Sequence, residues 1–308
     1  MTQSILLLGA GELGMAVLEA LAKHPRRGAD TKLAVLLRQS TIDSTALDKK
    51  RTTQHIRELG ASFEAADIAG ASIPELASIF QTYGTVISCT GMGLPPGTQT
   101  KITKAVLEAG VPRYIPWQFG MDYDIIGAGS SQDLFDEQLA VRALLRGQDR
   151  TRWTIVSTGV FMSFLLEPAF GVVDIGERTV RGLGSWETRI TTTTPEDIGR
   201  VTAEVALEGQ TGGSSSGTVL YTAGDTVSYA ELADKVEAHF GGAPFKRELW
   251  DGQVLKRQME EDPTTMVKYR DTFAQGRGVA WDKVETVNYQ RGIPMMDVEA
   301  YLKTLKRE

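Results

Sequence analysis

Three glycines near the amino terminus have the spacing of a phosphate-binding turn. Gly9, Gly11 and Gly14 form the pattern G-x-G-x-x-G, directly after a short apolar run and before a helical pattern. In such a turn the first glycine permits the tight bend, the second lets the backbone approach a pyrophosphate, and the third lets helix and strand pack closely. The helix N-terminus then faces the anion. The sequence therefore predicts a dinucleotide site, to which Glu12 and Leu13 of the same turn also belong.

A basic residue stands where such folds distinguish the two nicotinamide dinucleotides. Folds that prefer NAD(H) usually carry Asp or Glu at the end of the second strand, where it accepts hydrogen bonds from the ribose. This chain has Arg38, Gln39 and Ser40 there. A guanidinium can stack on adenine and donate two hydrogen bonds to a 2′-phosphate. It has no acceptor atom for the hydrogen of a ribose hydroxyl. We therefore expect NADP(H), with a solvated strand-end charge as the alternative for Arg38.

A second candidate for the adenine end of the cofactor follows the third apolar run. Asp67 and Ile68 stand directly after that run. The carboxylate of Asp67 can accept a hydrogen bond from the adenine amino group. An ordinary loop carboxylate is the equally weighted alternative.

Composition excludes several other classes of protein. The 308 residues include 33 Lys plus Arg and 39 Asp plus Glu, a net charge of −6 that disfavours nucleic-acid binding by counterion release. Cys89 is the single cysteine and the 3 histidines are far apart, which excludes an intrachain disulfide and makes a metal site unexpected. No apolar run approaches the roughly 20 residues of a membrane span, and the first residues lack a leader pattern. We therefore expect a cytoplasmic protein.

Apolar runs alternate with helical patterns through the first half of the chain. The runs are typical of strands buried on both faces, and such alternation predicts right-handed βαβ units. We therefore expect an α/β protein with a Rossmann-like, doubly wound parallel sheet. The expected strands are 4–8, 32–37, 62–66, 85–89, 113–116 and 153–157, and the expected helices are 12–23, one that ends near 59, 73–80, 99–109 and 133–146.

The alternation stops after Gly159. We place an NADP-binding domain at 1–158 and a smaller, mixed substrate-binding part at 159–308, with some of 190–225 returning to the first sheet. Residues 161–170 are apolar but too short to span a membrane. The glycine- and serine-rich run 212–217 indicates a surface loop. The other expected elements are a strand at 218–222 and helices at 229–240, 250–261, 264–275 and 298–306.

One segment resembles a known family signature. The chain lacks the Tyr-x-x-x-Lys pair of ordinary short-chain dehydrogenases, because none of its 8 tyrosines has Lys four residues on. Residues 114–122 read Tyr-Ile-Pro-Trp-Gln-Phe-Gly-Met-Asp, which resembles the Pro-Ser-Glu-Phe-Gly signature of isoflavone-reductase-like and NmrA-like proteins, a group of atypical short-chain dehydrogenases. The glycine pattern, Arg38 and the segments 59–61, 66–68, 158–161 and 194–199 match the same family.

The resemblance implies a location for cofactor and substrate. NADP(H) is expected at the carboxyl ends of the strands, with the substrate in a cleft against the C-terminal part. The residues implied beside the nicotinamide are Cys89, Thr90, Gly91, Trp117, Gln118 and Phe119. Large side chains suited to a planar, aromatic or polyketide-like secondary metabolite are Trp117, Tyr123, Phe161, Phe164 and Trp186, with a place in the core as the alternative for most of them.

One position departs from the family. Its reductases carry a catalytic Lys in the context Phe-Glu-x-Lys-x-x-x-Arg, whereas residues 135–142 read Phe-Asp-Glu-Gln-Leu-Ala-Val-Arg, so Gln138 replaces the lysine. Gln138 shares a helix face with Leu134, Val141 and Leu145, which predicts that it points inward. There it is either hydrogen-bonded in the core or lines a cavity, and the family position favours the cavity. An amide is neither acid nor base near neutral pH, yet it can polarise a carbonyl or orient a water.

The loss of the lysine leaves three functions open. The first is an NADP(H)-dependent reductase of a small molecule, whose proton would come from Asp122, Tyr123 or Asp124. The second is a non-catalytic dinucleotide sensor that reports to a regulatory protein partner. The third is a non-redox cyclase or isomerase on the same fold. The missing Tyr/Lys pair and family lysine favour the sensor, but no partner motif supports it, and we expect the reductase.

Overall fold

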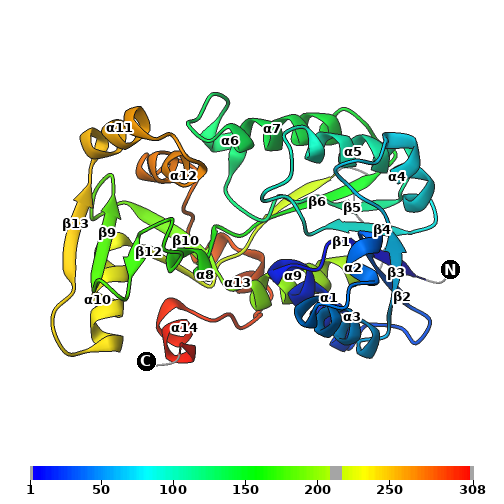
Figure 1. Cartoon of the computed structure of the whole chain (residues 1–308), viewed down its shortest axis with the longest axis horizontal. Helices are drawn as coiled ribbons and strands as arrows, with labels where there is room; N and C mark the ends of the chain where they lie inside the picture. Colours follow the sequence, from blue (N-terminus) through cyan, green and yellow to red (C-terminus); the bar gives the residue numbers. More distant parts are fainter. Residues whose placement is uncertain (1–2, 209–216, 306–308) are drawn as a thin grey trace. The chain divides into compact units, whose positions relative to one another are not determined.

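The computed structural model describes residues 3–208 and 217–305 of the chain (Figure 1). The chain divides into two compact units, each made of three segments. Unit 1 comprises Met1–Gln118, Glu137–Val156 and Ile198–Leu220, and unit 2 comprises Phe119–Asp136, Ser157–Asp197 and Tyr221–Glu308. The domain boundary expected between residues 158 and 159 stays a prediction. Residues 212–216 of the expected loop and residue 306 of the expected last helix lie outside the described residues.

A doubly wound sheet forms unit 1, as the sequence predicts. Its strands lie in the order β11-β6-β5-β4-β1-β2-β3, and the pairings from β6 to β3 are parallel. The strand order reverses between β1 and β4, the position where such sheets bind ligands at their carboxyl ends. The strands are β1 (Ser4–Leu8), β2 (Lys32–Leu37), β3 (Ala61–Ala65), β4 (Thr85–Ser88), β5 (Arg113–Ile115), β6 (Arg152–Ser157) and β11 (Thr218–Tyr221).

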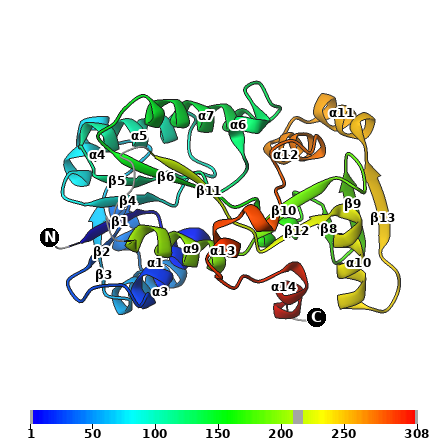
Figure 2. The same cartoon turned by 180° about the vertical axis from the view of Figure 1, so that it is seen from behind.

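Helices cover both faces of this sheet, with α4, α5 and α7 on one face and α1, α3 and α9 on the other (Figures 1 and 2). Because both faces are covered, Ile5 to Leu8 of β1 are completely buried, which explains their continuous apolar sequence. The helices are α1 (Glu12–Lys23), α2 (Gln39–Ile42), α3 (Leu47–Glu58), α4 (Ile73–Phe80), α5 (Thr98–Glu108), α7 (Asp133–Arg146) and α9 (Pro195–Leu207).

In the described part of unit 2, two small sheets have three strands each. One has the order β12-β10-β7 and the other β13-β9-β8, and each combines parallel with antiparallel pairs. The strands are β7 (Val160–Phe161), β8 (Val173–Asp174), β9 (Thr179–Leu183), β10 (Arg189–Thr193), β12 (Asp225–Ser228) and β13 (Lys246–Trp250). The helices are α6 (Tyr123–Ile126), α8 (Met162–Leu165), α10 (Tyr229–Phe240), α11 (Gly252–Glu261), α12 (Thr265–Ala274), the 3-10 helix η1 (Lys283–Glu285), α13 (Val287–Gln290) and α14 (Val298–Thr304).

The sequence analysis was wrong about one helix start and missed the strands given above for unit 2. The helix expected from residue 250 begins at Gly252, because Trp250 is the last residue of β13 and the side chain of Asp251 caps the helix. Strand β10 reads Arg-Ile-Thr-Thr-Thr and therefore shows no apolar run, although its last four residues are buried. Its threonine hydroxyls bond within unit 2, which allows these polar residues to lie in a core.

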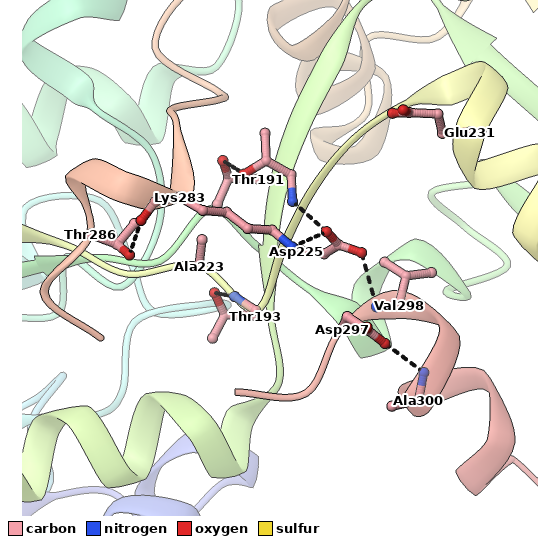
Figure 3. Close-up of polar contacts among 12 residues, drawn as sticks. Thr191, Thr193, Ala223, Asp225, Glu231, Lys283, Thr286, Asp297, Val298 and Ala300 are labelled. Carbon is pink, nitrogen blue, oxygen red and sulfur yellow. Dashed lines mark hydrogen bonds and ion pairs between the residues drawn. The ribbon is translucent and has the colours of Figure 1, made fainter. Parts of the chain in front are cut away.

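A buried carboxylate connects three elements of unit 2 (Figure 3). Asp225, at the start of β12, forms an ion pair of 2.5 Å with Lys283 of η1. Its second oxygen accepts a hydrogen bond from the main-chain N–H of Val298, the first residue of α14. The side chain of Asp225 is 9% exposed, so water does not replace these partners readily.

The substitution Asp225→Ala is expected to lower the free energy of unfolding by about 1–3 kcal/mol, because it leaves the buried Val298 N–H without this acceptor. Asp282→Ala is the matched control. Asp282 pairs with Arg189 at 3.4 Å, but both side chains are more than half exposed, and the expected change is within about 0.5 kcal/mol. Urea unfolding followed by circular dichroism measures both, and equal losses would contradict the role given to Asp225.

Candidate functional site

The three glycines of the turn after β1 have three different structural requirements. Gly9 has φ +94°, a conformation that L-residues rarely adopt. A Cβ on Gly14 would lie 2.3 Å from the carbonyl oxygen of Gly9, so only glycine fits there. A Cβ on Gly11 would meet nothing within 4 Å, which leaves open space beside that backbone. This combination of a tight turn, a close packing and an open face is the one a bound pyrophosphate needs.

The helix that follows the turn has an N-terminus without a side-chain cap. Gly11 is the N-cap of the 12-residue helix α1 and makes no side-chain hydrogen bond. The first amides of a helix have no intrahelical acceptor and carry the positive end of its dipole. Glu12 is exposed, whereas Leu13 is buried and anchors the first turn in the core. These features fit a phosphate group in front of Gly11.

The candidates for the adenine end lie at the carboxyl ends of β2 and β3. Arg38, Gln39 and Ser40 are exposed directly after β2, and the side chain of Gln39 donates to Asp43. Asp67 is exposed after β3 and accepts from the Ala69 N–H, while Ile68 is buried. Because β1, β2 and β3 are parallel neighbours, these residues lie on the same sheet edge as the glycine turn.

The turn after β4 packs against the glycine turn. A Cβ on Gly9 would lie 2.9 Å from the Cβ of Thr90, and a Cβ on Gly91 would lie 2.1 Å from the ring of Trp117. The side chain of Gln99 donates to the Thr90 carbonyl at 3.0 Å. Burial raises the pKa of the Cys89 thiol, which therefore stays protonated and is a poor nucleophile. The structure thus brings together Gly91 and Trp117, two residues that the resemblance places beside the nicotinamide.

A carboxylate next to Gln138 holds helix α7 against helix α5. The side chain of Glu137 accepts hydrogen bonds from the main-chain N–H groups of Gly97, Gln99 and Thr100, at 3.0, 2.7 and 3.1 Å. These are orphan donors at the N-terminus of α5, where a negative charge is favourable. The sequence analysis missed Glu137, because its partners are backbone amides about 40 residues away along the chain and leave no side-chain signal.

Gln138 lies in a buried network of polar side chains within unit 1. It is 1% exposed, and its Oε1 accepts from Nε2 of Gln118 at 2.8 Å. The same Gln118 Nε2 donates to the Gln138 carbonyl at 2.9 Å, and the Gln118 Oε1 accepts from Nε of Arg142 at 2.8 Å. Nε2 of Gln138 is buried and has no hydrogen-bond partner in the described parts of the chain. Gln118 takes the place of Glu in the Pro-Ser-Glu-Phe-Gly signature, so two departures from that family pattern touch one another.

The candidate substrate and proton-donor residues that belong to unit 2 have structural contacts there. Tyr123 and Phe164 belong to one aromatic cluster, in which Tyr123 packs on Phe135 and Phe135 and Phe164 each pack on Tyr269, at ring distances of 4.8 to 5.6 Å. The hydroxyl of Tyr123 lies close over Gly120.

The other candidates of unit 2 lie outside this cluster of paired rings. Asp122 caps α6 through the N–H groups of Asp124 and Ile125, and it accepts from the hydroxyl of Tyr221. Phe161 lies in β7, and Trp186 packs over Gly182 of β9. Phe119 is 8% exposed. Within residues 3–208 and 217–305 no group of three or more His, Cys, Asp or Glu is arranged to hold a metal ion, and no helix is long and apolar enough to cross a membrane.

The substitution Gly14→Ala is expected to destabilise the protein, because the new methyl group would overlap the Gly9 carbonyl and force the turn to shift. Such overpacking typically costs about 1–3 kcal/mol. Gly11→Ala is the matched control: its methyl group meets no atom, and we expect a loss below about 1 kcal/mol from the poorer N-cap. Thermal unfolding of the two variants tests this, and a larger loss for Gly11→Ala would refute the assignment.

This chain is similar to known proteins both in sequence and in fold. The model of the NmrA-like family matches residues 1–302. A protein of Gibberella moniliformis named NmrA-like family domain-containing oxidoreductase is 54% identical over 303 residues, which cover 98% of each chain.

Solved structures share the fold at low sequence identity. An isoflavone reductase has a TM-score of 0.78 at 19% identity over 98% of this chain and 99% of its own. The structure of AtPrR2 with NADP⁺ and (+)-pinoresinol has a TM-score of 0.78 at 17% identity, and the match covers 98% of both chains. The leucoanthocyanidin reductase–NADPH binary complex from Vitis vinifera has a TM-score of 0.76 at 19% identity. The match covers 97% of this chain and 98% of that chain. On the family match and the 54% identical relative, this chain belongs to the NmrA-like family.

Proposed function

We propose that the protein is an NADPH-dependent reductase of a small molecule with a polarised carbonyl group. The observation that carries the proposal is the turn after β1, where an open Gly11 lies at the uncapped N-terminus of α1. The oxidoreductase name of the 54% identical relative supports the same class of reaction. A planar aromatic or polyketide-like secondary metabolite is the proposed substrate. Neighbours of the same fold, an isoflavone reductase and AtPrR2 solved with (+)-pinoresinol, support this class.

The residues present in unit 1 fit a nicotinamide dinucleotide. The turn Gly9 to Gly14 would hold the pyrophosphate against the amides of α1, and Arg38 would pair with a 2′-phosphate. Asp67 would accept from the adenine. Gly91 and Trp117, which pack on one another, would border the nicotinamide ring. When bound, the reduced cofactor supplies a hydride.

Gln138 is the residue proposed to act on the substrate. Its unpartnered Nε2 would donate a hydrogen bond to the carbonyl oxygen and stabilise the negative charge that develops there on reduction. The product alkoxide then needs a proton. Asp122, Tyr123 and Asp124 are the proposed donors. We propose a cytoplasmic location for this reaction.

The cofactor assignment predicts that NADPH binds at least tenfold more tightly than NADH, a difference of about 1.4 kcal/mol. Arg38→Ala should remove most of this preference by weakening NADPH and NADP⁺, which carry the 2′-phosphate, and not NADH or NAD⁺. Because Arg38 is exposed, the protein should still fold. Arg150→Ala, an exposed arginine before the amino end of β6, is the control that should keep it. Calorimetric titration with NADPH, NADP⁺, NADH and NAD⁺ measures all three proteins. If none of the four dinucleotides binds, the cofactor proposal is wrong.

The role of Gln138 predicts a selective loss of turnover. Gln138→Met should lower kcat for carbonyl reduction by about 10²- to 10³-fold, the effect of removing one oxyanion donor, with the Kd for NADPH unchanged. NADPH oxidation across a panel of aromatic carbonyl compounds measures this. A dinucleotide sensor would instead bind NADPH and NADP⁺ equally without turnover, and a non-redox cyclase or isomerase would convert its substrate without consuming NADPH.

A further inference from the structure

We infer that Gln118 and Arg142 are positioning residues that fix which end of the Gln138 amide is presented as a hydrogen-bond donor. A consequence is that lysine at position 138 would be compatible with this network only if position 118 carried a carboxylate. The inference deepens the proposed function and rests on it for the part played by Gln138 in turnover. The orientation of the amide is a separate, structural statement.

The polarity of the network begins at Arg142. A guanidinium has five N–H donors and no acceptor, and it stays charged in proteins. The contact of 2.8 Å from Nε of Arg142 therefore requires an oxygen on Gln118, which assigns Oε1 to that end. The other end of the Gln118 amide is then Nε2, a donor with two hydrogens. Amide ends are normally assigned from such networks, and this one starts at a group that cannot be reversed.

Both hydrogens of the Gln118 amide have acceptors on Gln138. One bonds the main-chain carbonyl at 2.9 Å and the other bonds the side-chain Oε1 at 2.8 Å. The oxygen of the Gln138 amide is thereby fixed towards Gln118. Its Nε2 is left over, buried and without a partner in the described chain. A buried donor without a partner is unfavourable, and a carbonyl oxygen of a bound molecule would supply the missing acceptor.

The same polarity decides which residues can replace the pair. A lysine at 138 would bring an ammonium, which only donates, against the Gln118 Nε2, which also donates. A glutamate at 118 would keep one oxygen on Arg142 and offer the other to that ammonium, which restores a donor–acceptor pair. A glutamate at 118 opposite the native Gln138 would face its Oε1 with an acceptor. The amide of Gln138 would then turn and present its oxygen where the donor had been.

The experiment compares the native protein with Gln118→Glu, Gln138→Lys and the double variant. For turnover with an aromatic carbonyl compound, each single variant should lose at least tenfold in kcat with the KM for NADPH unchanged. The double variant should exceed both single variants, and it should gain a pH dependence from the new lysine. Single variants whose effects add, with no recovery in the double variant, would overturn the inference. Thermal unfolding checks that every variant is folded at the assay temperature.

A readout independent of activity follows the amide itself. In protein labelled with 15N-glutamine, the Gln138 side-chain signals are those absent from Gln138→Lys. In Gln118→Glu these signals should move downfield, because the turned N–H₂ gains a carboxylate acceptor. Gln148→Glu is the matched control: Gln148 also bonds the backbone of unit 1, at Leu145 and Thr151, and its substitution should leave kcat and the Gln138 signals unchanged.

The two readouts separate this inference from the proposed function. Unchanged Gln138 signals and native kcat in Gln118→Glu would overturn the positioning role while the reductase assignment stands. A native protein that never oxidises NADPH would refute the reductase assignment. In that case the movement of the Gln138 signals in Gln118→Glu still decides whether position 118 sets the polarity of the amide.

Discussion

The close approach between Gly14 and the carbonyl oxygen of Gly9 is the constraint on which the carboxyl edge of the unit 1 sheet depends. A Cβ at position 14 would overlap the carbonyl oxygen of Gly9. Only glycine at this position therefore lets the start of α1 lie so close to the end of β1. That approach brings the uncapped amides of α1 to the carboxyl edge of the sheet. Thr90 packs on Gly9 from the neighbouring strand end, which links the turn after β4 to the same edge.

Helix α7 carries the second half of the candidate site, and charge and hydrogen bonding fix its position in addition to the apolar packing of Val141 and Leu145. Glu137 satisfies three amides at the N-terminus of α5, and the adjacent Gln138 bonds Gln118 beyond the end of β5. These polar contacts specify one registration of α7, because a rotation of the helix would leave several buried groups unsatisfied. An apolar interface would tolerate such a rotation more readily.

The buried Nε2 of Gln138 is an exception to the rule that interior polar groups are paired. Beside it, both hydrogens of the Gln118 amide are used, one on the main-chain carbonyl of Gln138 and one on its side-chain Oε1. Local departures of this kind are where functional sites are expected in a folded protein, which is why Gln138 is a candidate site residue. The aromatic cluster of unit 2 is different, because the rings of Phe135 and Phe164 each pack on the ring of Tyr269.

The sequence by itself determined the fold of unit 1 and the place of its glycine turn. Continuous apolar runs report strands covered on both faces, and Gly9, Gly11 and Gly14 act through backbone geometry that is local to six residues. The inward face of Gln138 also followed from helical spacing. The threonine-rich strand β10 was not predicted from the sequence, because burial of its side chains depends on hydroxyl partners elsewhere in the chain. Only the tertiary structure decided that Gln118, Gln138 and Arg142 share one network, because a hydrogen bond between residues 20 positions apart leaves no periodic trace in the sequence.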